Sequence, residues 1–119
     1  MYLNNGDKYE GDWKNDKKEG KGVFYYNKQD EFKRQLYDGY WKNGKREGKG
    51  AMFWINYDVY KGDWKNDKIE GKGIMCFPKG DRYEGEWVSG KRTGKGTYYF
   101  ANGNKKEGFW ENDKFLGEE

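Results

Sequence analysis

Five tryptophans recur along this chain at nearly constant spacing, and this recurrence constrains the fold more than any other feature. They are separated by 28, 23, 23 and 23 residues, and each follows a glycine by two residues. All 19 glycines of the 119-residue chain occupy fixed positions of one repeating unit. A fixed period of roughly 20 to 50 residues indicates a repeat array, in which each unit packs mainly against its neighbours. The tryptophans are Trp13, Trp41, Trp64, Trp87 and Trp110.

The repeating unit reads Tyr-x-Gly-x-Trp, a turn, Gly-Lys-Gly and four mostly apolar residues. Residues 1–119 are therefore interpreted as one array. Both ends stop within a unit, so we expect either a piece of a longer array or a partner or second copy that completes the open ends. The copies are expected at residues 9–26, 37–54, 60–77, 83–100 and 106–117, with a long loop at residues 27–36.

Alternation of side chains within each unit predicts β-strands. Between Tyr9 and Trp13, the rings and the glycine share one parity, and the charged residues share the other. Pairs such as Asn15-Asp16 suit a two-residue hairpin turn, which requires positive φ. One hairpin cannot bury its rings alone, so hairpins must stack. The sequence therefore predicts an all-β fold, an elongated open meander of stacked β-hairpins in one twisted antiparallel sheet.

A two-residue turn also fixes the register that we expect within each hairpin. Counting outward from the turn places Tyr9 opposite Gly22, so that the ring covers a bare glycine. The same count places Glu10 opposite Lys21 as an ion pair on the other face. The face of rings and glycines is expected to be the structural core. Its positions are Tyr9, Gly11, Trp13, Tyr37, Gly39, Trp41, Tyr60, Gly62, Trp64, Tyr83, Gly85, Trp87, Gly108 and Trp110.

The opposite face carries apolar residues in the second strand of each hairpin. A single twisted sheet has no second layer to cover them, which suggests a surface for a protein partner such as a docked helix. Alternatively, coiling of the sheet hides these side chains. The positions of this candidate strip are Val23, Tyr25, Ala51, Phe53, Ile74, Cys76, Thr97 and Tyr99.

The composition points away from catalysis. Histidine is absent, which removes histidine-based acid–base chemistry and histidine metal ligands. The carboxylates recur on alternating strand positions, so we expect solvated pairs. Cys76 is the single cysteine, cannot form an internal disulfide, and is interpreted as a small apolar filler. No catalytic residue, cofactor or metal site is predicted, and we expect a protein that is not an enzyme.

The charge balance limits the kinds of partner. The chain has 24 Lys and Arg against 21 Asp and Glu, which is too even for a nucleic-acid footprint, and no nucleic-acid partner is expected. No apolar run reaches the length of a transmembrane helix, and residues 1–8 lack the apolar stretch of a signal peptide, so with a single cysteine we expect a reducing intracellular compartment. Lysines recurring at the turns could face acidic lipid or form a solvated rim. They are Lys17, Lys45, Lys68, Lys91 and Lys114.

The repeating unit resembles the MORN repeat (membrane occupation and recognition nexus), whose pattern is close to Tyr-x-Gly-x-Trp-x-x-Gly-x-x-x-Gly-x-Gly. Five copies match in register between Tyr9 and Gly117. The departures are Lys106 in place of the first tyrosine of the last copy, Asp in place of the turn glycine in three copies, and the long loop before the second copy.

The resemblance implies an interaction module. Proteins with such repeats serve as scaffolds in cilia and flagella, including radial spokes, in the cytoskeleton and at membrane junctions. The implied function is a protein–protein interaction scaffold in a ciliary, axonemal or cytoskeletal assembly of the cytoplasm. A helix or strand would dock on the sheet or at its ends. The alternative is a peripheral membrane adaptor that binds acidic phospholipid head groups.

Overall fold

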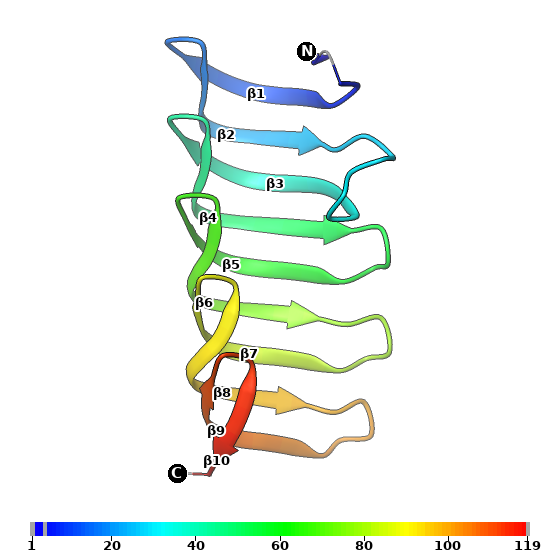
Figure 1. The fold of residues 1–119 in the computed structure, drawn as a ribbon, viewed down its shortest axis with the longest axis vertical. Coiled ribbons are helices and arrows are strands. Elements are labelled where there is room, and N and C mark those ends of the chain that lie inside the picture. The colour runs from blue at the N-terminus through cyan, green and yellow to red at the C-terminus, as the bar shows by residue number, and fades with distance from the viewer. Residues whose placement is uncertain (1, 4, 119) are drawn as a thin grey trace.

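The computed structural model describes residues 2–3 and 5–118, and these residues form one antiparallel sheet of ten strands in chain order (Figure 1). The predicted all-β meander of hairpins is therefore confirmed. The strands are β1 (Lys8–Lys14), β2 (Lys17–Tyr25), β3 (Arg34–Lys42), β4 (Lys45–Trp54), β5 (Val59–Lys65), β6 (Lys68–Cys76), β7 (Arg82–Val88), β8 (Lys91–Tyr99), β9 (Lys105–Glu111) and β10 (Lys114–Gly117).

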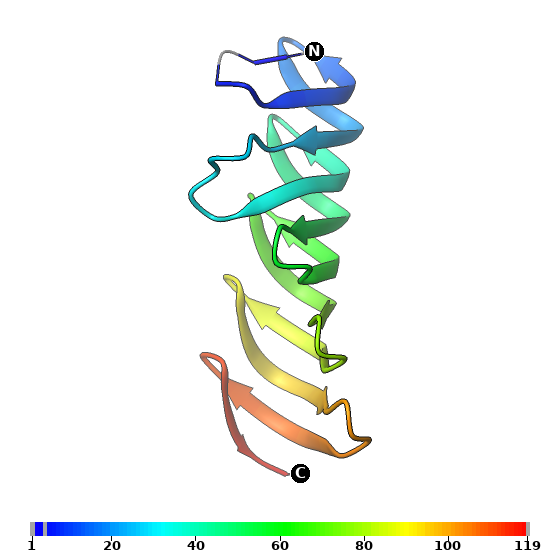
Figure 2. The same ribbon diagram turned by 90° about the vertical axis from the view of Figure 1, so that its right-hand side faces the viewer.

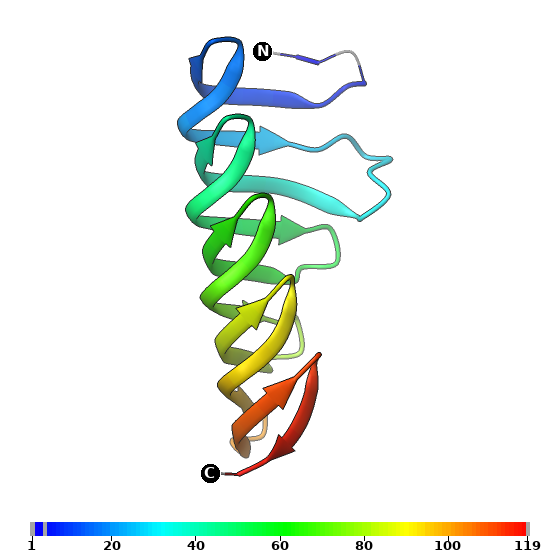
Figure 3. The same cartoon turned by 60° about the vertical axis from the view of Figure 1, so that its left-hand side comes forward.

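The sheet is elongated and curled. Its principal extents are 47 × 25 × 19 Å, and the hairpin turns form one long edge while the loops form the other (Figure 1). Figures 2 and 3 show that the turn end of each hairpin curls over, so that the sheet is a trough. The long loop is shorter than expected because β3 begins at Arg34, which leaves residues 26–33 between β2 and β3.

The register within each hairpin differs from the prediction. Trp13 lies opposite Lys18 as counted, but Gly11 lies opposite Gly22, and Tyr9 lies opposite Phe24. The reason is a β-bulge in which residues 19–21 oppose a single residue of β1. Its glycine, Gly20, has φ +72°, a conformation that favours glycine. The predicted pairs Tyr9/Gly22 and Glu10/Lys21 are therefore wrong, and the same shift recurs in β3–β4, β5–β6 and β7–β8.

Because of this register, glycines form one continuous row across nine strands. The row consists of Gly11, Gly22, Gly39, Gly50, Gly62, Gly73, Gly85, Gly96 and Gly108. Tyrosine rings lie over these glycines. A Cβ added to Gly73 would lie 2.1 Å from Tyr60 Oη and 2.4 Å from its Cζ. The predicted reason for the glycine, room for a ring, therefore applies although the strand register is different.

The core is a ladder of rings that links each hairpin to the one before it. Tyr37, Tyr60 and Tyr83 are fully buried, and Trp64 is 5% exposed. Each tryptophan after the first packs edge-on against the tyrosine of the preceding repeat, at centroid distances of 5.3 to 5.7 Å. Trp13 differs from the prediction: it is 42% exposed, since no described hairpin precedes it.

The last hairpin, β9–β10, keeps this packing without the tyrosine. Trp110 is buried and packs against Tyr83 of the preceding repeat at 5.3 Å. Lys106, which replaces the tyrosine, is exposed. Phe115 of β10 lies 5.1 Å from the Trp110 ring and covers this end of the core.

Candidate functional site

The face of the sheet opposite the rings carries a row of apolar residues across β2 to β6. We call it the outer apolar row, and each member is the Cα partner of the next. Its members are Tyr25, Leu36, Phe53, Val59 and Cys76. The described residues form one sheet, so no second layer of the described chain covers this row. Tyr25 and Cys76 are exposed, and the other three members are half-buried.

The outer apolar row includes only part of the predicted strip. Tyr25, Phe53 and Cys76 belong to it, whereas Leu36 and Val59 were missed. The signal was available, because both residues directly precede the first tyrosine of a repeat and so share the parity of the opposite face. Cys76, which we interpreted as a small apolar filler, is exposed on this face.

The remaining members of the predicted strip are separated from this row by charges. Arg82 lies between Cys76 and Tyr99, and its guanidinium stacks on the Tyr99 ring at 3.9 Å. The other four residues lie in a neighbouring row, where each has charged residues as cross-strand partners. This row runs Glu10, Val23, Asp38, Ala51, Lys61, Ile74, Glu84, Thr97 and Glu107. The eight predicted positions therefore do not form one continuous apolar strip on the sheet.

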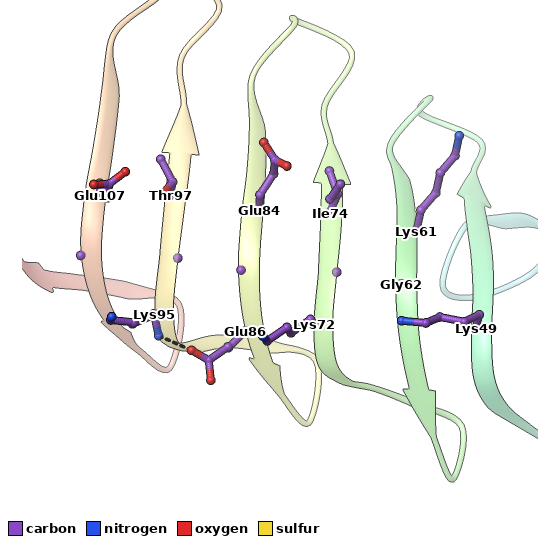
Figure 4. Close-up of a pocket in the computed structure, with 14 residues that line it drawn as sticks. Lys49, Lys61, Gly62, Lys72, Ile74, Glu84, Glu86, Lys95, Thr97 and Glu107 are labelled. Atoms are coloured by element: carbon purple, nitrogen blue, oxygen red, sulfur yellow. Dashed lines mark hydrogen bonds between the residues drawn. The ribbon is translucent and has the colours of Figure 1, made fainter.

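Beside this mixed row, the glycines form the floor of a furrow of about 640 Å³ on the outer face (Figure 4). Charged side chains of both signs rise on both sides of the floor, and among them Lys49, Glu84 and Glu107 form ion pairs with neighbouring residues. Lys49 forms an ion pair with Asp63. Burial would raise the pKa of Asp63, but the Lys49 ammonium and the Lys72 backbone N–H hold it below its usual value. The furrow is therefore a polar surface with largely compensated charge.

The ring face is the inside of the trough, because residues from both edges of the sheet line one cavity there. This cavity has a volume of about 380 Å³ and combines Phe32 and Trp54 near the loops with Ile69 and Gly90 near the turns. Cations stack on the rings of the trough: the Arg46 guanidinium lies 4.9 Å from the Trp64 ring. Burial of tyrosines here raises their pKa, and that of Tyr83 rises to about 12.

The five turn lysines that could face lipid are all exposed. At three turns the strand partner is also a lysine: Lys14 with Lys17, Lys42 with Lys45, and Lys65 with Lys68. At the other two turns the partners are Val88 and Glu111. Cationic side chains therefore gather along the turn edge of the sheet.

Neither a metal centre nor a membrane-spanning helix was found in the described part of the chain. Residues 2–3 and 5–118 contain no group of three or more His, Cys, Asp or Glu side chains that could hold a metal ion. Within the same residues, no helix is long and apolar enough to cross a membrane.

Comparison with known proteins identified one family model, described as MORN repeat. It matches residues 9–31, 37–59, 60–82 and 83–105, which is most of the chain. The four matches begin at the first residue of each of the first four predicted copies. The fifth predicted copy, residues 106–117, lies outside the matched residues, although β9 and β10 repeat the tryptophan contacts of the other hairpins. No curated protein matches the chain.

Proposed function

Because the chain belongs to the MORN repeat family, we propose that it is a non-catalytic protein–protein interaction scaffold, a structural subunit of a ciliary, axonemal or cytoskeletal assembly in the cytoplasm. MORN repeats generally take part in protein–protein or membrane interactions, and the family is a binding family. The choice of a ciliary or cytoskeletal assembly is an analogy with proteins that the repeat pattern resembles.

One observation carries the scaffold proposal: the outer apolar row is open to solvent on a sheet whose own core lies on the other face. Phe53 and Val59 lie at its centre, flanked by Leu36 and Cys76. Contiguous exposed apolar surface marks interaction sites more often than scattered apolar residues do. The ring cluster on the other face forms the core, so the outer apolar row is not used to hold the strands together.

The test is native cross-linking combined with a paired substitution in the row. Phe53→Glu with Val59→Glu places two carboxylates in the centre of the row, and Val88→Glu is the control, since Val88 is 49% exposed at a turn. We expect cross-links from the wild type and the control to axonemal or cytoskeletal proteins, and their loss from the paired variant. Unchanged cross-links in the paired variant, with a native circular dichroism spectrum, would contradict the proposal.

The alternative is a peripheral membrane adaptor, and the pairs of lysines along the turn edge favour it. Each basic residue near an anionic membrane surface contributes about 1 kcal/mol. Co-sedimentation with vesicles of phosphatidylcholine alone or with acidic lipid, at two salt concentrations, separates the two functions. Binding that requires acidic lipid, weakens with salt and is lost in Lys42→Gln with Lys45→Gln supports the adaptor. The scaffold proposal expects no such binding.

A further inference from the structure

Arginines tie some neighbouring hairpins together along the turn edge of the sheet. The backbone N–H and Nε of Arg46 donate hydrogen bonds to Asp67 Oδ1 at 2.8 and 3.1 Å, and its Nη2 donates to the Asp67 carbonyl oxygen at 3.0 Å. Arg92 makes the same three contacts with Asp113, at 2.8, 3.1 and 3.0 Å. We call this arrangement the arginine clamp. It joins β4 to the β5–β6 turn, and β8 to the β9–β10 turn.

The clamp is absent at β6, because neither of its residues is present there. Ile69 occupies the position of Arg46, and Gly90 occupies the position of Asp67. The contacts between these two segments are a backbone bond from Gly90 N to the Ile69 oxygen at 2.9 Å, and one from Ser89 N to Glu70 Oε2 at 2.6 Å. At β2 the clamp is absent as well, since Lys18 faces Gly44.

The loop edge has a second set of ties, made by a backbone N–H one or two residues after the end of a strand. Asn27 donates to Asp7 Oδ1 at 2.7 Å, and Ala101 donates to Asp81 Oδ1 at 2.7 Å. Ile55, directly after β4, donates to the Lys33 carbonyl oxygen at 2.9 Å. These bonds connect the loops that follow β2, β4 and β8 to the loop of the preceding repeat.

Proline removes this tie after β6. Pro78 occupies the position of Ala101 and has no N–H to donate to Asp58, which is the equivalent of Asp81. Asp58 instead bonds within its own loop: its N–H and its carboxylate both bond to the Asn56 side chain. Thus β4 and β8 have a tie at both edges and β2 has one at the loop edge, whereas β6 has neither.

We infer that the array bends at β6, which acts as a hinge between the hairpins on either side. The backbone ladder continues through β6, so the hinge preserves the sheet, while its two edges lack the clamp and the loop tie that restrain the edges at β4 and β8. Ile69, Ser89 and Gly90 line the cavity of about 380 Å³ inside the trough, together with Phe32 and Trp54. Bending at β6 therefore changes the width of the trough at this cavity. The inference does not depend on the proposed scaffold function.

Four equivalent backbone amides test the hinge in the 119-residue chain. The amides of Gly44, Asp67, Gly90 and Asp113 each bond to the second residue of the preceding repeat's second strand, at 2.9 to 3.0 Å. Hydrogen exchange followed by NMR, corrected for intrinsic rates, is expected to give Gly90 about tenfold less protection than Asp67 and Asp113. Gly44, which lacks the clamp but keeps the loop tie, is expected between them. Equal protection at all four amides would overturn the inference.

Variants that restore the missing ties at β6 provide a second test, measured by the same hydrogen exchange. Ile69→Arg with Gly90→Asp adds the clamp, and the backbone permits the aspartate because Asp67 and Asp113 have φ of 69° and 71° at the same position. Pro78→Ala alone restores the amide donor and leaves the core untouched. Both variants are expected to raise the protection of residue 90. The control, Lys18→Arg with Gly44→Asp, is expected to leave the protection of residue 90 unchanged. The hinge would be overturned if this protection rose in the control, or if it rose in neither of the two restoring variants.

Spin labels measure the bending directly. After Cys76→Ser, labels at Lys45 and Lys91 span two repeats across β6. Labels at Lys17 and Lys68 span two repeats that end at the first residue of β6. All four lysines are exposed. The Lys45–Lys91 distance distribution is expected to be broader and to narrow in Pro78→Ala. Equal widths of the two distributions would contradict the hinge.

Discussion

The indole N–H of Trp64 donates a hydrogen bond of 3.1 Å to the carbonyl oxygen of Gly50, in the preceding repeat. The same bond recurs from Trp41 to Gly22, and further along the array. A buried indole needs a partner for its N–H, and here the partner is the carbonyl oxygen of a glycine in the glycine row. One side chain therefore joins two repeats by a polar contact and by a ring contact, at 5.3 Å from Tyr37.

The fit between ring and glycine predicts a non-additive pair of substitutions. Gly73→Ala places a Cβ 2.1 Å from Tyr60 Oη and is expected to destabilise the protein by about 3 kcal/mol, as overpacking of a close-packed core does. Tyr60→Ala removes the ring and creates a cavity of its own, but it makes room for the methyl group. Chemical denaturation of both single variants and the double variant is expected to show the Gly73→Ala cost largely absent in the Tyr60→Ala background. Simple additivity of the two costs would show that the ring does not require the glycine.

The buried tyrosines predict a loss of stability at high pH. Burial raises the pKa of Tyr83 to about 12, and raises those of Tyr37 and Tyr60 as well. Below pH 10 these groups are protonated in both the folded and the unfolded chain. As the pH rises above about 10, the unfolded chain releases protons that the folded chain retains, so the free energy of unfolding falls.

This fall is measured by denaturant titration at several alkaline pH values, with tyrosinate absorbance as a second observable. Tyr83→Phe is expected to make the dependence on pH shallower, because one raised pKa is removed. Tyr57→Phe, at a side chain that is 78% exposed, is the matched control and is expected to match the wild type. A wild-type stability that stays constant between pH 9 and pH 12 would contradict the prediction.

Two equivalent aspartates on the loop edge are expected to differ in their contribution to stability. Asp81 accepts hydrogen bonds from the Ala101 N–H at 2.7 Å and from Tyr98 Oη at 3.0 Å, both in the next repeat. Asp81→Ala is therefore expected to cost about 2 kcal/mol, as the loss of bonds to a charged group does. Asp58→Ala, at the residue that bonds within its own loop, is expected to cost less. Thermal unfolding of the two variants compares them, and equal costs would argue against a tie between loops.

The sequence was sufficient to predict the repeat, the hairpins and the ring face, because these follow from period and parity. It was insufficient for the register, because the two-residue turn at Asn15-Asp16 does not show that Gly20, four residues later, forms a bulge. The wrong register misplaced the charge pairs: Lys49 pairs with Asp63 in the next hairpin, and not within its own.

The outer surface was predicted only in part for a similar reason. Counting along the second strands found Phe53 but not Val59, which reaches the same row from the first strand of the next hairpin. Contact between neighbouring hairpins depends on how they stack, and parity within one hairpin does not determine it. The exposure of Trp13 likewise depends on whether a hairpin packs before it. The tryptophans at the same position of the other copies are buried, so the residue type alone does not determine exposure.

The most direct test of the stacked ring ladder compares the same substitution at two copies of one residue. Trp64 is 5% exposed and bonds to the preceding repeat, whereas Trp13 is 42% exposed and packs on Tyr9 of its own hairpin. In urea denaturation, Trp64→Ala is expected to cost about 3–5 kcal/mol, and Trp13→Ala less than half of that. Equal costs for the two variants, or a Trp64→Ala protein as stable as the wild type, would contradict the ladder as the source of cohesion between repeats.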